Sequence, residues 1–144
     1  MAASQRPGSR RGPLRAADPL ARVAARVLRW ERARRARIEL ALLGPTAMRR
    51  LNRRATGRRG LTDVIAFTLP QPDGAILGDV YICPAAARAF VTGDRLREEL
   101  VRLAVHGTLH VLGYDHPDGP GRTRSAMWQR QERYVRRLMG RGRA

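Results

Sequence analysis

Three histidines, the only ones in the chain, lie within the eleven-residue segment HGTLHVLGYDH. His106 and His110 are four residues apart, so on a helix their imidazole rings project from one face at a spacing that suits a single metal ion. Gly113 can adopt the left-handed backbone conformation that ends a helix, and the chain can then return His116 to the same point. The spacing therefore predicts that the three imidazoles converge.

Three neutral nitrogen ligands leave a fourth tetrahedral position for water, which is the open geometry of a catalytic zinc site. A metal ion in such a site lowers the pKa of its bound water to about 7 and supplies hydroxide at neutral pH. We therefore expect one zinc ion per chain and a hydrolytic reaction. Nickel, copper and cobalt also accept three imidazoles, so ligand chemistry alone leaves the metal open. The single cysteine, Cys83, excludes a site built from several thiolates.

The same spacing coincides with the ligand frame HExxHxxGxxH of the metzincin proteases. Gly107 stands at the position of the glutamate that takes a proton from the attacking water in that family. A small metalloprotease is therefore the weaker interpretation. It would gain support if Glu98 or Glu99 touched the metal-bound water.

The chain is strongly basic, with 29 Lys+Arg against 12 Asp+Glu among 144 residues and a net charge of +17. Every basic residue is arginine, whose planar guanidinium matches phosphate oxygens in pairs, so the charge suits a polyanion such as nucleic acid. A GC-rich genome explains the choice of arginine but not the excess of positive charge. No apolar run reaches the length of a membrane span. We expect a soluble, cytoplasmic protein that binds RNA and no membrane.

The helix that carries two of the histidines must be the central one, because residues 95–112 are apolar on most sides. Further elements are expected around it. The predicted helices cover residues 18–36, 46–55, 84–91 and 123–139, and the predicted strands cover 37–43, 62–69 and 75–83. The last two strands read as a hairpin. This order predicts an α+β fold in which helices cover a small mixed β-sheet.

The chain is long enough for one domain, which we place at residues 18–140. Residues 1–17 and 141–144 are expected to form flexible basic tails that add nothing to the core. The arginine-rich start also resembles an organellar transit peptide, although arginine richness continues to the far end. Polar residues at element ends are interpreted as caps or turn formers: Asp18, Thr46, Asp63, Cys83, Asp94 and Asp115.

The histidine segment resembles the signature of the YbeY family, metal-dependent endoribonucleases of ribosomal RNA maturation. Further blocks match that family in the same order and at similar spacing, so the resemblance covers about residues 20–140. These blocks are Leu51–Gly57, Thr62–Phe67, Leu77–Cys83, and Met127 with Glu132 in the last helix. The resemblance implies the YbeY fold and cleavage of single-stranded RNA at the 3′ end of 16S ribosomal RNA and in ribosome quality control. It also implies zinc ligation by His106, His110 and His116, with the small ribosomal subunit as partner.

One position departs from the family, because Thr56 stands where many relatives have an arginine that faces the RNA phosphate. Arg58 or Arg59 is expected to take that role from the same loop, with Arg54 as a further alternative. Asp79 is expected either to orient a ligand histidine or transfer a proton, or to serve only as a strand-edge residue. The predicted catalytic residues are therefore these loop arginines and Asp79.

A competing interpretation from another class is a non-catalytic ribosome-assembly factor. Such a factor would bind RNA through its arginines and use the metal only to fold. Both interpretations predict metal binding, and RNA cleavage separates them. The cleavage site, the protein partners and the oligomeric state are left open by the sequence.

Overall fold

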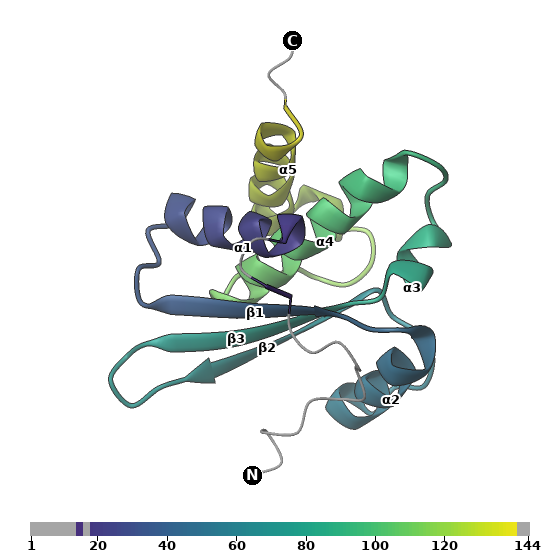
Figure 1. The fold of residues 1–144 in the computed structure, drawn as a ribbon, viewed down its shortest axis with the longest axis horizontal. Coiled ribbons are helices and arrows are strands. Elements are labelled where there is room, and N and C mark those ends of the chain that lie inside the picture. Colours follow the sequence, from purple (N-terminus) through teal and green to yellow (C-terminus); the bar gives the residue numbers. More distant parts are fainter. Residues whose placement is uncertain (1–13, 16–17, 141–144) are drawn as a thin grey trace.

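The structure of the chain is a computed structural model, which describes residues 14–15 and 18–140. The described residues form five α-helices and three strands (Figure 1). In chain order these are α1 (Pro19–Trp30), β1 (Ala36–Leu42), α2 (Pro45–Thr56), β2 (Val64–Pro70), β3 (Ile76–Ile82), α3 (Pro84–Arg88), α4 (Arg95–Val111) and α5 (Ala126–Leu138). A 3-10 helix at Arg122–Arg124 precedes α5. The predicted α+β class is confirmed.

The strands form one mixed sheet in the order β1-β3-β2. β2 and β3 pair antiparallel, as the predicted hairpin requires, and β1 pairs parallel with β3. The hairpin turn is closed by the amide of Gln71, which donates to the carbonyl of Ala75 (2.8 Å), and Gly74 has a φ of 89°. Both the hairpin and the mixed sheet follow the prediction.

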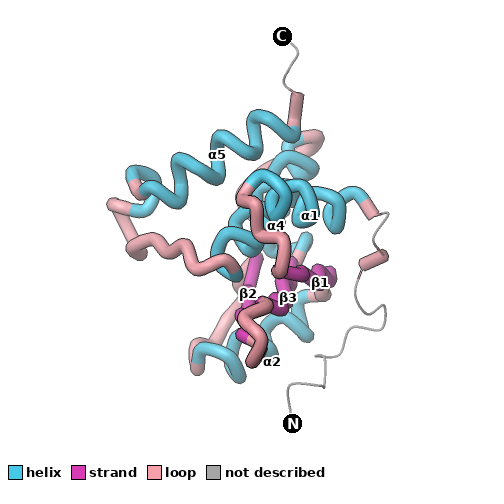
Figure 2. The backbone as a smooth tube through the Cα atoms, turned by 90° about the vertical axis from the view of Figure 1, so that its left-hand side faces the viewer, coloured by secondary structure: helices cyan, strands magenta, loops and turns pink. Residues whose placement is uncertain are grey.

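Helices cover both faces of the sheet (Figures 1 and 2). α1, α4 and α5 lie on one face and α2 lies on the other. Because side chains alternate along a strand, β3 serves both layers. Val80 and Ile82 belong to the core cluster that contains α4, whereas Tyr81 and Cys83 belong to the cluster that contains α2.

α4 is the predicted central helix, and every residue from Leu103 to Leu109 is buried. Its approach to the sheet is close at Gly107, where an added Cβ would lie 2.5 Å from Cγ1 of Val80. Gly78 of β3 is crowded in the same way, because a Cβ there would lie 2.4 Å from Cγ1 of Val111. Two glycines therefore set the distance between the helix and the sheet.

α1 is shorter than predicted and ends at Trp30 instead of continuing to residue 36. Arg32 takes a φ of 57°, and the chain reverses before β1 begins at Ala36. The arginine-rich sequence after Trp30 suits a helix, but Ala36 pairs with Ile76 at the edge of the sheet. Strand pairing overrides helix propensity here.

Two of the predicted caps form as expected. The Asp18 carboxylate accepts a hydrogen bond from the amide of Leu20, and the Asp115 carboxylate accepts one from the amide of His116. Thr46 is not a cap, because Pro45 already occupies the first turn of α2 and Gly44 takes the N-cap position. Asp94 and Cys83 take N-cap positions without a capping hydrogen bond from their side chains.

Most of the predicted tails, namely residues 1–13, 16–17 and 141–144, lie outside the described residues. Leu14 is described, and it contradicts the expectation that residues 1–17 add nothing to the core. Its amide donates to the carbonyl of Leu40 (2.7 Å), and its side chain packs against the main cluster. Within the described part of the chain, no helix combines the length and the low charge that a bilayer-spanning segment requires.

Candidate metal centre

The three histidines come from the end of α4 and the loop that follows it. Gly113 has a φ of 103° and turns the chain after α4, which brings His116 back toward His106 and His110. One ligand atom from each residue lies within 4.8 Å of the others. The ring centroids are 4.5, 5.0 and 5.0 Å apart. The predicted convergence of the imidazoles is confirmed.

Each imidazole is oriented by a hydrogen bond at Nδ1. The partners are Gln131 Oε1 for His106 (2.6 Å), the Tyr114 carbonyl for His110 (3.0 Å) and the Pro117 carbonyl for His116 (3.0 Å). These oxygens only accept, so each Nδ1 carries the proton and each Nε2 keeps a free lone pair. The donor set therefore fits a divalent transition metal held by three Nε2 atoms.

Burial keeps two of the imidazoles neutral. Desolvation lowers the pKa of His106 to about 4, although its hydrogen bond with Gln131 acts in the opposite direction. The pKa of His110 is also lowered, mainly by burial. The neighbouring histidines and the charge of Arg122 add to the lowering for His106. Both rings are unprotonated at pH 7, which is the state that binds a metal.

The loop between His110 and His116 is tied to the end of α1 through Glu31. The Tyr114 hydroxyl donates to Glu31 Oε1 (2.7 Å), and the Arg130 guanidinium donates to Oε2 (2.9 Å). The Tyr134 hydroxyl donates to the same Oε2. Because the carbonyl of Tyr114 orients His110, this carboxylate supports the metal centre from a distance.

Replacing Glu31 with glutamine is expected to reduce stability most at neutral pH. Burial raises the pKa of Glu31, but hydrogen bonds from Tyr134, Tyr114 and Arg130 outweigh it and hold the pKa below its usual value. The folded state therefore binds this proton less readily than the unfolded state does, and the stabilisation is lost as pH falls below about 4.3. Denaturant unfolding between pH 3 and 7 should show the wild type and Glu31→Gln converging in acid. If the stability difference between the wild type and Glu31→Gln does not change with pH, the Glu31 carboxylate does not stabilise the fold in this way. The same holds if the difference equals that of the exposed Asp118→Asn control.

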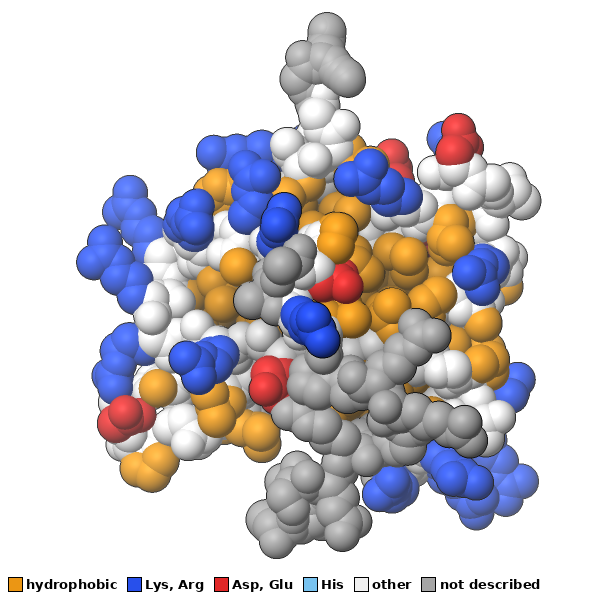
Figure 3. Space-filling view, viewed as in Figure 1, with side chains coloured by type: hydrophobic (Ala, Val, Ile, Leu, Met, Phe, Trp, Pro, Cys, Tyr) orange, Lys and Arg blue, Asp and Glu red, His pale blue; other side chains and the backbone are white. Residues whose placement is uncertain are grey.

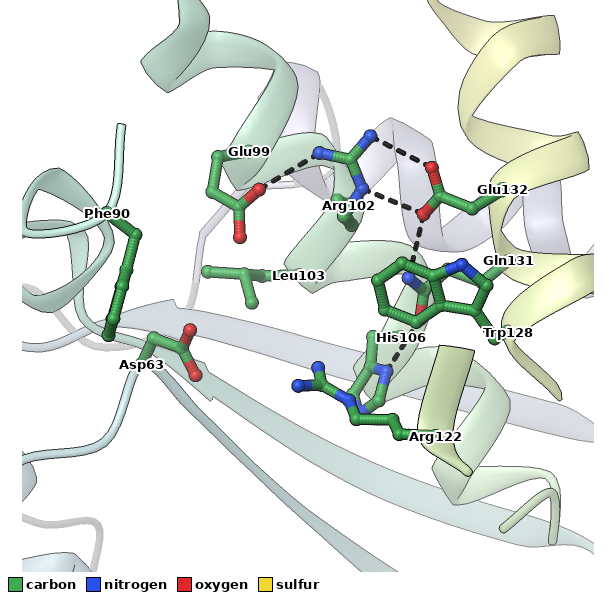
Figure 4. A pocket seen from close by; sticks show the side chains of 10 residues that line it. All are labelled: Asp63, Phe90, Glu99, Arg102, Leu103, His106, Arg122, Trp128, Gln131 and Glu132. Atoms are coloured by element: carbon green, nitrogen blue, oxygen red, sulfur yellow. Dashed lines mark hydrogen bonds and ion pairs between the residues drawn. The ribbon is translucent and has the colours of Figure 1, made fainter. Parts of the chain in front are cut away.

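A cavity of about 400 Å³ opens beside His106 (Figure 4). Distant parts of the chain line it, among them Asp63 before β2, Phe90 after α3, Arg102 on α4, and Arg122 and Trp128 near the C-terminus. The burial of Asp63 raises the pKa of its carboxyl group. The cavity thus combines acidic, basic and aromatic side chains next to one of the three imidazoles.

A chain of hydrogen bonds leads from His106 to Arg102 (Figure 4). Gln131 accepts from His106 and donates to Glu132 (2.9 Å), and Glu132 accepts two bonds from Arg102 (2.8 and 3.0 Å). Arg102 also pairs with Glu99 (2.9 Å) and Glu98 (3.1 Å). These two glutamates are therefore engaged with an arginine, and the metalloprotease interpretation loses its alternative base.

The predicted arginines of the α2–β2 loop are exposed and do not line the cavity. The amide of Arg58 donates to Thr56 Oγ1 (3.1 Å), and that hydroxyl in turn donates to Asn52. Thr56 therefore stabilises the end of α2. The assignment of Arg58 or Arg59 to the phosphate stays a prediction.

Asp79 does not lie where an orienting residue is needed. Gly78 and Val80 contact α4, so the alternation of β3 directs Asp79 to the opposite face of the sheet. All three Nδ1 atoms bond to other groups. The expectation that Asp79 orients a ligand histidine is therefore not supported. Asp63, interpreted from sequence only as a cap, is the aspartate that faces the cavity.

Sequence reasoning missed three residues of the site, namely Gln131, Arg122 and Trp128. Gln131 meets His106 across a separation of 25 residues, and no local spacing signals such a contact. The available signal was a polar residue on the apolar face of α5, where Gln131 is 1% exposed among Met127, Tyr134 and Val135.

The fold and the site together define an α+β protein with a three-histidine centre, able to hold a metal ion, at the end of a buried helix. The family model described as Endoribonuclease YbeY matches residues 15–139. The chain therefore belongs to the YbeY family, as its motifs predicted.

Curated relatives and one solved structure are similar to the chain. Endoribonuclease YbeY of Mycobacterium ulcerans is 39% identical over 94 residues, which cover 56% of this chain and 53% of the relative. Endoribonuclease YbeY of Mycolicibacterium gilvum is 38% identical over 96 residues, covering 58% and 54%. The solution structure of TM1509 from Thermotoga maritima matches with a TM-score of 0.56 and 28% identity, covering 84% of this chain and 79% of that one. The chain spans about half the length of the curated relatives it matches.

Proposed function

We propose that the protein is a zinc-dependent endoribonuclease that cuts single-stranded RNA. The reaction serves maturation of the 3′ end of 16S ribosomal RNA and ribosome quality control in the cytoplasm, with the small ribosomal subunit as partner. The observation that carries the proposal is the convergence of three imidazoles beside a cavity lined by arginine. The names of the similar curated proteins support the same activity.

His106, His110 and His116 would hold the metal through Nε2. A bound zinc ion supplies a Lewis acid and activates water at neutral pH. The hydrogen bonds at Nδ1 keep the rings in the ligand tautomer and direct them inward. Asp63 faces the cavity with a raised pKa, so its carboxyl group, rather than that of Asp79, is suited to exchange a proton with the reacting groups.

The charge of the chain and the lining of the cavity suit a polyanion with unstacked bases. The net charge is +17, and Figure 3 shows arginine side chains distributed around the outline of one face, with few acidic side chains. Phe90 lines the cavity and is 77% exposed, so its ring is free to stack on a base. Stacking on aromatic rings is typical of single-stranded nucleic acid recognition. Arg58 and Arg59, outside the cavity, would contact the RNA backbone further along.

Metal removal tests the proposal. We expect protein purified without chelator or nickel resin to contain about one equivalent of zinc and to cut a precursor of the 16S 3′ end. Chelator treatment should reduce cleavage at least about 100-fold, and zinc should restore it, because the metal contributes several kcal/mol to the transition state. Elemental analysis, circular dichroism and a gel assay give the metal content, the fold and the rate.

Two outcomes would contradict the proposal. Full cleavage by metal-free protein would exclude a role for the three histidines in the reaction. Protein that holds one metal and binds the precursor without cutting it would instead be the non-catalytic assembly factor.

A further inference from the structure

Two arginines line the cavity beside His106, and their surroundings differ. Arg102 is surrounded by Glu98, Glu99 and Glu132, and these contacts raise its pKa. Its charge is therefore neutralised within the protein. Among the described residues, no carboxylate forms an ion pair with Arg122. Arg122 is the cavity arginine whose charge is available to a ligand.

Contacts other than an ion pair with a carboxylate hold Arg122 in place. Its guanidinium carbon lies 5.3 Å from the ring centroid of Trp128. A cation–π contact of this kind uses none of the guanidinium N–H groups as hydrogen-bond donors to an acid. The backbone is fixed as well, because the Arg122 amide donates to Gly119 (3.1 Å) and its carbonyl accepts from the hydroxyl of Ser125 (2.8 Å).

The Arg122 side chain extends into the cavity beside His106. In Figure 4 it crosses the cavity beside His106, and its guanidinium lies on the side that faces Asp63. Burial raises the pKa of Asp63, and the positive charge of Arg122 acts in the opposite direction, so the guanidinium is close enough to influence this carboxyl group. A cation at this place is needed if an anionic substrate is to approach the histidines.

We propose that Arg122 contacts the scissile phosphate of the RNA. The inference rests on the proposed endoribonuclease activity. A guanidinium binds two phosphate oxygens in parallel and stabilises the charge that develops on them during cleavage. Arg58 and Arg59 are exposed in the loop after α2 and do not reach the cavity. Arg122, in the segment before α5, is therefore the cavity cation that can meet the phosphate.

Substitution of Arg122 tests the inference against a matched arginine. With a single-stranded RNA substrate, Arg122→Ala should lower kcat/KM at least about 100-fold, the loss typical of removing one donor to a developing oxyanion. Arg122→Lys should recover part of the rate, because lysine keeps the charge but not the fork. The control Arg124→Ala lies in the same 3-10 helix and should change the rate less than about threefold, because its side chain does not line the cavity.

A binding measurement separates this inference from the proposed activity. The chain has two tryptophans, so Trp30→Phe leaves Trp128, which contacts Arg122, as the fluorescent reporter. Titration with inorganic phosphate should change its emission, and Arg122→Ala in the same background should weaken binding at least about tenfold. Metal content and circular dichroism should be equal in both proteins, which excludes loss of metal or fold as the cause.

The outcomes are distinct. If the wild type cuts RNA while Arg122→Ala cuts it and binds phosphate equally well, the inference is wrong and the activity stands. If Arg124→Ala loses as much as Arg122→Ala, the effect is general electrostatics and the inference is also wrong. If the wild type cuts no RNA but phosphate binding depends on Arg122, the activity fails and the anion site remains.

Discussion

His110→Ala is expected to remove the metal and to reduce RNA cleavage about 1000-fold or more. His110 supplies one of three converging imidazoles, and two ligands hold a divalent ion far less tightly than three. The loss of several kcal/mol of transition-state stabilisation corresponds to this change in rate. Elemental analysis and single-turnover cleavage of the 16S precursor measure the two effects. His110 is only half-buried at the end of α4, so circular dichroism should show an intact fold.

Gln131→Ala should give a smaller loss in the same assays. It removes the hydrogen bond that orients His106 but leaves all three ligands, and such partners are worth about 10–100-fold in metal affinity. Gln129→Ala is the matched control, because it removes an exposed glutamine from the same helix. We therefore expect the loss of metal and of cleavage to increase from Gln129→Ala through Gln131→Ala to His110→Ala. If His110→Ala keeps stoichiometric metal and full cleavage, the three histidines are not the site.

Gly107→Ala is expected to destabilise the protein by about 1–3 kcal/mol, the usual cost of overpacking. Alanine in a helix favours folding by about 1 kcal/mol over glycine. Whether Gly107→Ala stabilises or destabilises the protein therefore depends on how crowded the site is. A Cβ at position 107 would lie 2.5 and 3.1 Å from the two γ-carbons of Val80, which is fully buried on β3. Crowding therefore outweighs helix propensity. Denaturant unfolding at pH 7 measures the free energy of unfolding.

A double-mutant cycle with Val80→Ala tests this cause. Val80→Ala removes the γ-carbons that an alanine at position 107 would meet, so the two substitutions together should cost about 1 kcal/mol less than the sum of the single changes. Additive costs would show that the crowding lies elsewhere. The same contact explains why no glutamate occupies this position, because Gly107 faces the sheet at a distance that admits no side chain.

Local patterns in the sequence predicted most of the fold and the centre of the site. The i, i+4 spacing of His106 and His110 places both rings on one face wherever that helix packs, and Gly113 permits the turn that returns His116. The β2–β3 hairpin was likewise predictable, because Pro70 through Gly74 supply a turn between two β-branched runs. These features depend on residues that are neighbours in the chain.

Contacts between distant elements account for what the sequence did not predict. The end of α1 was misplaced because the pairing of β1 with β3 overrides the helix propensity of the segment after Trp30. Of the roles left open for Asp79, the structure supports that of a strand residue and not that of orienting a histidine, because β3 faces two layers and alternation directs this side chain away from α4. Gln131 and Arg122 were missed because α5 and the segment before it reach the cavity only after packing.

The amino-acid sequence by itself therefore determined the α+β class and the three imidazoles of the centre, because these follow from local spacing and periodicity, while the family was indicated by the resemblance of its motifs. Only the tertiary structure decided which side chains surround that centre. Gln131, Arg122, Trp128 and Asp63 share the cavity or its hydrogen bonds with His106, although each of them is distant from His106 in the chain. The physical reason is that such proximity comes from the packing of α4 against the sheet and α5, which no pattern of neighbouring residues encodes.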